Sequence, residues 1–89
     1  MTKRVTIRIL YFASLREKLG RDAEAIELPA GVSTVAALRA HLRARGGPYG
    51  EVLAEKRLVR AALNQDMVGA GAPVKGGDEV AFFPPVTGG

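Results

Sequence analysis

Apolar and polar residues alternate at the start of the chain. Residues 5–9 read Val-Thr-Ile-Arg-Ile, the period of two that is typical of a half-buried β-strand, with Val5, Ile7 and Ile9 pointing inward. Leu10 and Phe12 break this pattern because they fall on the face expected to meet water. An apolar end on a polar face is typical of a contact surface, although a short neighbouring helix covering it would explain it equally well.

Two later segments have helical spacing. Residues 13–19 place two leucines one turn apart, and Gly20 follows as a C-terminal stop. The main helix is expected to begin at a cap, Ser33 or Thr34, and to run to about Arg45. Its buried stripe comprises Val35, Leu38 and Leu42, and its outer side carries Arg39 and Arg43.

The rest of the chain reads as short strands joined by turns. The glycines and proline of residues 46–48 end the main helix, and residues 49–55 are expected to form one short helical turn. The predicted strands after the first are 24–28, 58–63, 67–68 and 79–83, and the predicted turns are 64–66 and 75–78. One long helix with several strands predicts an α+β fold, with a single sheet covered on one face. At 89 residues the chain is expected to form one domain, spanning 1–89.

Composition excludes several classes of site. The chain has no cysteine, which removes disulfides, thiolate nucleophiles and cysteine-based metal sites. His41 is the only histidine, and nothing at ligand spacing accompanies it, so we expect a solvated helix residue and no metal site. No signal peptide or membrane span is indicated, so the chain reads as cytoplasmic.

The net charge of +4 leaves the kind of partner open. Basic residues gather at 39–45 and 56–60, yet no basic motif with interleaved aromatic residues suggests nucleic-acid binding, and acidic partner proteins suit the charge equally well. Gly76-Gly77 has neither Walker A nor dinucleotide-binding spacing and is expected to be a turn.

The last eight residues, Phe-Phe-Pro-Pro-Val-Thr-Gly-Gly, are the most distinctive stretch. Pro84 and Pro85 cannot donate to a strand ladder, so they are expected to end the sheet and begin an extended tail over residues 84–89. Val86 and Thr87 favour extended backbone, and Gly88 and Gly89 leave the final carboxylate on a chain without side chains. With no thiol present, this carboxylate is the group that remains to carry sulfur. The alternative is an inert, frayed terminus.

Residues 78–89 resemble the C-terminal signature of the small, sulfur-carrying subunits of molybdopterin synthase. Three further segments resemble that family in order and at its spacing: residues 10–13 with Arg16-Glu17, Thr34-Val35 with residues 37–39, and residues 62–65. The resemblance implies a ubiquitin-like β-grasp fold in which the first and last strands lie side by side and parallel. It also implies the site residues. Gly89 would be the reacting residue, residues 84–88 would thread a partner's active site, and the partner interface would comprise Phe12, Arg16, Met67 and Phe83.

The resemblance further implies a carrier cycle. A ubiquitin-activating-like adenylyltransferase would use ATP to adenylate Gly89, and a persulfide donor would convert the adenylate to a thiocarboxylate. The large synthase subunit would then transfer that sulfur to cyclic pyranopterin monophosphate. The chain would be a non-catalytic carrier subunit that binds no cofactor, because the active site and the ATP site would belong to its partners.

Three other functions stay open at this point. A sulfur carrier for thiamine thiazole or another thio-metabolite shares the fold and the Gly-Gly ending, as does a ubiquitin-like protein modifier. The Phe-Phe-Pro-Pro-Val-Thr segment argues against both. The third is a basic binding module whose tail is inert, and such a module would tolerate extension of its C-terminus.

Overall fold

The computed structural model describes residues 5–85. Helices and strands follow one another in an order close to the predicted one. The elements are β1 (Thr6–Tyr11), α1 (Ala13–Leu19), β2 (Ala23–Glu27), α2 (Val35–Arg43), α3 (Gly47–Val52), β3 (Arg60–Leu63), β4 (Asp66–Val68) and β5 (Glu79–Phe83).

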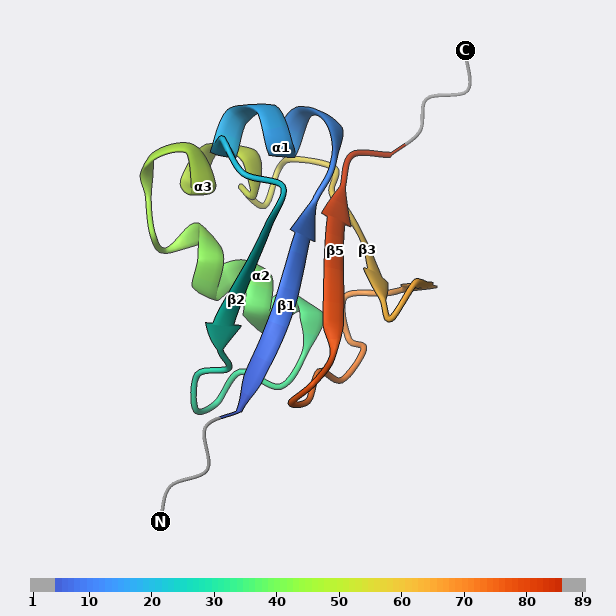
Figure 1. The fold of residues 1–89 in the computed structure, drawn as a ribbon. Coiled ribbons are helices and arrows are strands. Elements are labelled where there is room, and N and C mark those ends of the chain that lie inside the picture. The colour runs from blue at the N-terminus through green and yellow to red at the C-terminus, as the bar shows by residue number, and fades with distance from the viewer. Residues whose placement is uncertain (1–4, 86–89) are drawn as a thin grey trace.

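The strands form one mixed sheet in the order β2-β1-β5-β3-β4 (Figure 1). β1 and β5 are parallel neighbours at its centre, with Arg8 opposite Glu79 and Tyr11 opposite Phe82, whereas the other pairs are antiparallel. The α+β class and the central parallel pair are therefore confirmed. Because β1 and β5 are parallel, both strands finish at the same end of the sheet. Phe12 therefore lies close to the residues that follow Phe83.

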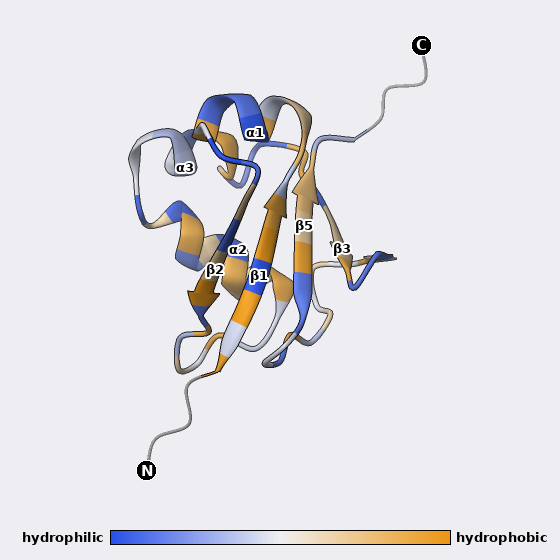
Figure 2. Ribbon diagram, viewed as in Figure 1, coloured by the Kyte–Doolittle hydropathy of each residue, from blue (hydrophilic) through white to orange (hydrophobic). Residues whose placement is uncertain are grey.

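The core lies between this sheet and α2, which runs behind it in Figure 1. The predicted stripe of α2 is confirmed, because Val35, Leu38 and Leu42 are all buried. Figure 2 shows that β1 and β5 are apolar along most of their length. Other buried residues include Ile7, Ile9, Tyr11, Leu15, Leu53, Val80 and Phe82. The inward placement of Val5 was wrong. Val5 is 39% exposed and precedes the first residue of β1.

Local signals set the helix ends. α1 matches its prediction, and Gly20 ends it in a left-handed conformation (φ 73°), with its N–H donating to the Arg16 carbonyl. Thr34, not Ser33, caps α2, because its hydroxyl accepts from the N–H of Ala37 at 3.1 Å. α2 ends at Arg43, two residues before the predicted end.

Besides the end of α2, three predicted boundaries were wrong by more than one residue: both ends of the short helix, which ends at Val52 and not at Glu55, and the start of β3. The short helix begins at Gly47, not at Tyr49, because Pro48 fits a first helical turn, where a missing N–H costs nothing.

β3 begins at Arg60, not at Leu58, because its first pair is Arg60 with Phe83 of β5 and the prolines after Phe83 cannot donate to a ladder. On its other side, β4 ends at Val68 and the chain then turns toward α2. Within residues 5–85 no helix combines the length and apolarity needed to cross a membrane.

Candidate functional site

β5 ends where the two prolines begin. Phe83 is the last strand residue, and Pro84 and Pro85 follow it half-buried, as expected of residues that cannot donate to a ladder. The predicted reacting residue, Gly89, and the tail residues Val86, Thr87 and Gly88 lie outside the described residues. The tail therefore starts at the end of the sheet where the two central strands, β1 and β5, both finish; we call this point the root of the tail.

An apolar row crosses the outer face of the sheet, the face opposite α2. Across the strands the register aligns Leu10 with Ala81, Ala81 with Ala62, and Ala62 with Met67. Phe12 and Phe83 continue the surface beyond this row, toward the root of the tail. We call this surface the outer patch, and its residues are Leu10, Phe12, Ala62, Met67, Ala81 and Phe83.

The outer patch contains the apolar residues predicted to contact a partner. Phe12 is 45% exposed and Met67 59%, while Phe83 is half-buried. Phe82 is buried against the helices, so strand alternation turns Phe83 to the outer face. The N–H of Phe12 donates to the Phe82 carbonyl at 3.1 Å, which brings Phe12 beside the end of β5. Arg16 is exposed in α1, one turn after Phe12.

A polar cluster behind the sheet holds the end of β1. The Glu24 side chain, only 10% exposed, accepts from the hydroxyls of Tyr11 at 2.8 Å and Tyr49 at 2.9 Å. Arg45 contributes a guanidinium N–H at 2.9 Å and lies 4.9 Å from the centre of the Tyr49 ring. Tyr11 is the last residue of β1 and directly precedes Phe12. The cluster therefore fixes the end of β1 that adjoins the outer patch.

The cluster changes how its groups titrate. Burial alone would raise the pKa of the Glu24 carboxyl, but hydrogen bonds from Arg45, Tyr11 and Tyr49 outweigh it and hold that pKa below its ordinary value. Burial and the bond to Glu24 raise the pKa of Tyr11. The folded protein therefore holds Glu24 charged and Tyr11 protonated.

Glu24→Gln is expected to lower the free energy of unfolding at pH 7 by about 1–3 kcal/mol, because it weakens charge-assisted hydrogen bonds in a site shielded from water. The lowered pKa means that the unfolded chain takes up the proton first. Glu24 therefore contributes stability above its unfolded pKa, and this is lost as pH falls through the folded pKa. Urea unfolding between pH 7 and pH 3 should show a shallower acid loss in Glu24→Gln. The control is Glu17→Gln, an exposed carboxylate on α1; equal acid profiles for parent and Glu24→Gln would contradict the assignment.

The prediction that Arg39 lies on the outer, solvated side of α2 was wrong. Its guanidinium donates to the carbonyls of Leu53 at 3.0 Å, Ala54 at 2.6 Å and Arg57 at 2.9 Å. It thus satisfies carbonyls at and beyond the end of α3 and fixes the segment that leads into β3. Arg43, one turn later, is half-buried and pairs with Glu55 at 3.6 Å.

A fully buried carboxylate, that of Asp78, holds the start of β5. Asp78 is buried and accepts from the Asn64 amide at 3.0 Å and the Lys75 backbone N–H at 2.9 Å. These bonds hold the pKa of Asp78 below its ordinary value. The Asn64 side chain also accepts from the N–H of Glu79 at 2.9 Å. The β3–β4 turn, where Asn64 has a positive φ of 50°, is thereby tied to the first residue of β5.

Sequence reasoning missed both carboxylates, although one signal was available for Glu24. It shares the alternating face of Ile26 and Leu28, so its position among inward residues indicated a buried acid. Tyr11, Arg39 and Asn64 lie in the segments that resemble the family, but sequence reasoning assigned no role to them. In the structure, the side chain of each forms hydrogen bonds that hold neighbouring segments in place. His41 is exposed on α2, as predicted.

Comparisons with known proteins agree with this geometry. The Escherichia coli (strain K12) molybdopterin synthase sulfur carrier subunit is 47% identical over 83 residues, which is 93% of this chain and 99% of that protein. The putative molybdopterin converting factor subunit 1 from Pyrococcus furiosus superposes with a TM-score of 0.74 at 30% identity, over 92% of this chain and 99% of that one.

A modifier protein shares the fold as well. SAMP1 from Haloferax volcanii also gives a TM-score of 0.74, at 25% identity and over 94% of this chain and 99% of that one. Residues 9–89 match the ThiS family. With this match over most of its length and a curated relative at 47% identity, the chain belongs to the ThiS family and groups within it with the sulfur carrier subunits of molybdopterin synthase.

Proposed function

We propose that this chain is the sulfur carrier of a molybdopterin synthase and that Gly89 carries the sulfur as a terminal thiocarboxylate. The observation that carries the proposal is the 47% identity, over almost the full length of both chains, to a curated protein of that name. The ending Phe-Phe-Pro-Pro-Val-Thr-Gly-Gly supports it, because a carboxylate is the sulfur-bearing group available to a chain without cysteine.

The chemistry of a carboxylate explains the sequence of steps. A carboxylate is a poor acyl donor until one oxygen becomes a good leaving group, so an adenylyltransferase joins Gly89 to AMP and releases pyrophosphate from ATP. A persulfide sulfur then attacks the acyl carbon and AMP leaves. A second thiol cleaves the resulting sulfur–sulfur bond, which leaves one sulfur atom on Gly89. Molybdopterin contains two dithiolene sulfurs, so two loaded tails are consumed for each molecule made.

The large synthase subunit is the proposed partner of the outer patch. The names of the similar proteins make them one subunit of a larger enzyme. Phe12, Met67 and Phe83 supply the apolar centre that protein interfaces favour, and Arg16 a polar rim. The patch adjoins the root of the tail, so docking there would direct residues 84–88 toward an active site in the partner and leave Gly89 deepest. Gly88 would keep the tail thin at its narrowest passage.

The direct test is the intact mass of the chain purified from cells that make molybdenum cofactor. We expect a fraction in which one oxygen is replaced by sulfur, about 16 Da heavier, with the change located in the C-terminal peptide. The same chain from cells lacking the activating enzyme is the control and should show the unmodified mass alone. A chain that never gains sulfur in either background would contradict the proposal.

A protein modifier is the second candidate, because SAMP1 has the same fold at 25% identity. A modifier would form isopeptide bonds between Gly89 and lysines of other proteins. A denaturing blot of the same cells distinguishes the two functions. A carrier leaves a single band at the size of the free chain, whereas a modifier leaves larger species that resist thiols.

A further inference from the structure

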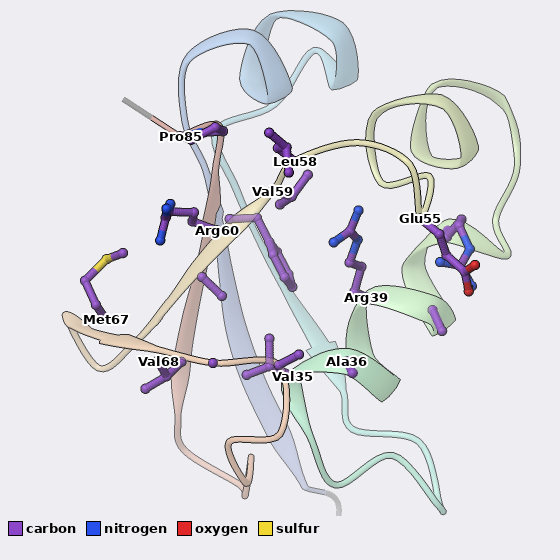
Figure 3. Close-up of a pocket in the computed structure, with 16 residues that line it drawn as sticks. Val35, Ala36, Arg39, Glu55, Leu58, Val59, Arg60, Met67, Val68 and Pro85 are labelled. Atoms are coloured by element: carbon purple, nitrogen blue, oxygen red, sulfur yellow. The ribbon is translucent and has the colours of Figure 1, made fainter. Parts of the chain in front are cut away.

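A groove opens on the helix side of the sheet, away from the main surface of the outer patch (Figure 3). It lies between α2 and the β3–β4 hairpin and has a volume of about 490 Å³. Its floor is apolar, with Val35 and Phe82 from the core and Ala36 and Ala40 from the helix. Leu58, 79% exposed, stands at its edge. At the rim, Met67 and Arg60 approach the outer face, and Pro85 belongs to the root of the tail.

The groove exists because two segments diverge. The β3–β4 pairing of Ala61 with Val68, continued by two residues, would place Val59 opposite Ala70. Instead, the Ala70 carbonyl accepts from the N–H of Ala36 at 2.8 Å, which draws this segment toward α2. The bonds from Arg39 to Ala54 and Arg57 hold the segment before β3 on the other side. A wedge therefore remains between Val59 and Ala70.

Val59 faces this wedge with unpaired backbone groups. Alternate residues of an antiparallel strand turn their N–H and C=O to opposite neighbours. The N–H of Asn64 donates to the Glu79 carbonyl in β5. Val59 lies an odd number of residues, five, before Asn64, so its N–H and C=O point to the opposite side, toward β4. Among the described residues Val59 makes no backbone hydrogen bond. An open strand edge of this kind can pair with another chain.

The charge of the rim selects the chemistry of that chain. Three guanidinium groups border the groove, from Arg39, Arg43 and Arg60, against a single carboxylate, Glu55. The Arg39 guanidinium is partly used by its hydrogen bond to the Ala54 carbonyl. Within the described residues, no ion pair involves Arg60. The groove is therefore apolar at its floor, positive at its rim and open at a strand edge.

We propose that this groove binds an extended peptide segment of a partner protein, with small apolar side chains on the floor and flanking Asp or Glu residues facing the arginines. The segment pairs with the backbone of Val59 and continues the sheet past the end of β4. Met67 and Pro85 line the groove and also belong, respectively, to the outer patch and the tail, but the proposal does not rest on sulfur transfer at Gly89, so either can fail without the other.

The probe is an acetylated and amidated peptide, Asp-Val-Ile-Val-Asp-Asp, titrated into the 15N-labelled full chain. We expect saturable amide shifts at Val59, Ala36 and Ala70, with a Kd below about 1 mM. A peptide with lysines in place of the acids should bind at least about tenfold more weakly. N-methylation of the central isoleucine should abolish binding, because it removes a backbone donor.

Two variants with the same charge change locate the site. Ala36→Glu places a carboxylate in the groove, in the first turn of α2, where acidic residues are compatible with folding. It should weaken binding of the acidic peptide at least about tenfold. Ser33→Glu adds the same charge to an exposed residue outside the groove and should change the affinity less than twofold.

Four outcomes would overturn the proposal. They are shifts confined to the outer patch, equal binding of the lysine peptide, binding that appears only after residues 86–89 are deleted, and groove shifts that follow protein concentration without peptide. The third would mean that the chain's own tail occupies the groove, and the fourth that a second copy does.

Discussion

A chain with one alanine added after Gly89 is expected to gain no thiocarboxylate from its activating enzyme, ATP and a persulfide donor, while the parent chain is converted. The addition turns the Gly89 carboxylate into an amide and moves the reactive carbon by about 3.3 Å. Because reacting atoms must approach to about 3–3.5 Å, and a misplacement of 1 Å can cost about a hundredfold, we expect a loss of at least that size. Intact mass after a timed reaction measures the conversion.

The matched control carries the same alanine before Met1, so its mass and composition are identical. Both variants should fold like the parent, because the buried residues of the described chain run from Ile7 to Phe82. Conversion of the extended chain at the parent rate would show that the reaction does not require Gly89 to be the terminal residue. A parent chain that is not converted under the same conditions would favour the function of a basic binding module with an inert tail.

Phe83→Ala is expected to weaken binding to the large synthase subunit about thirtyfold while leaving the chain folded. Aromatic residues at the centre of an interface often contribute about 2 kcal/mol or more, which corresponds to that factor. Phe83 lies on the outer face beside exposed Arg60 and is already partly exposed. Its truncation should therefore cost less stability than the roughly 3–5 kcal/mol typical of a core phenylalanine. Calorimetric titration and thermal unfolding of the same samples measure both quantities.

Leu58→Ala is the control for that experiment, since Leu58 is an exposed apolar residue outside the outer patch. Its removal should change the affinity for the large subunit less than twofold. Two results would contradict the placement of the interface. One is a Phe83→Ala chain that binds normally, and the other is a chain that unfolds, which would make Phe83 a core residue.

Local patterns predicted most elements because the interactions behind them span only a few residues. α1 and β5 have the predicted bounds, and Gly20 ends α1 through a bond to Arg16, four residues away. Where a boundary was wrong, a distant segment decided it. β3 starts at Arg60 because β5 ends at Phe83 and the chain after β4 turns to α2, which no pattern within residues 58–63 records.

The polar clusters show the same division more sharply. Arg39 has the spacing of an exposed helix residue, but its partners lie 14 to 18 positions later. Glu24 and Tyr11 are 13 positions apart, on adjacent antiparallel strands. A buried carboxylate is stable only when several donors converge on it, and neither periodicity nor charge predicts that convergence.

The sequence by itself determined the elements, the apolar stripe of α2 and, through its ending and three family-like segments, the family to which the chain belongs. The parallel pairing of β1 with β5 was implied by the resemblance and not by the pattern. Tertiary structure alone decided which carboxylates are buried, which arginine braces a loop and where β3 loses its neighbour. The reason is physical: a period or a cap acts within one or two turns of the chain, whereas a sheet edge, a buried charge and a groove depend on segments that meet only after folding.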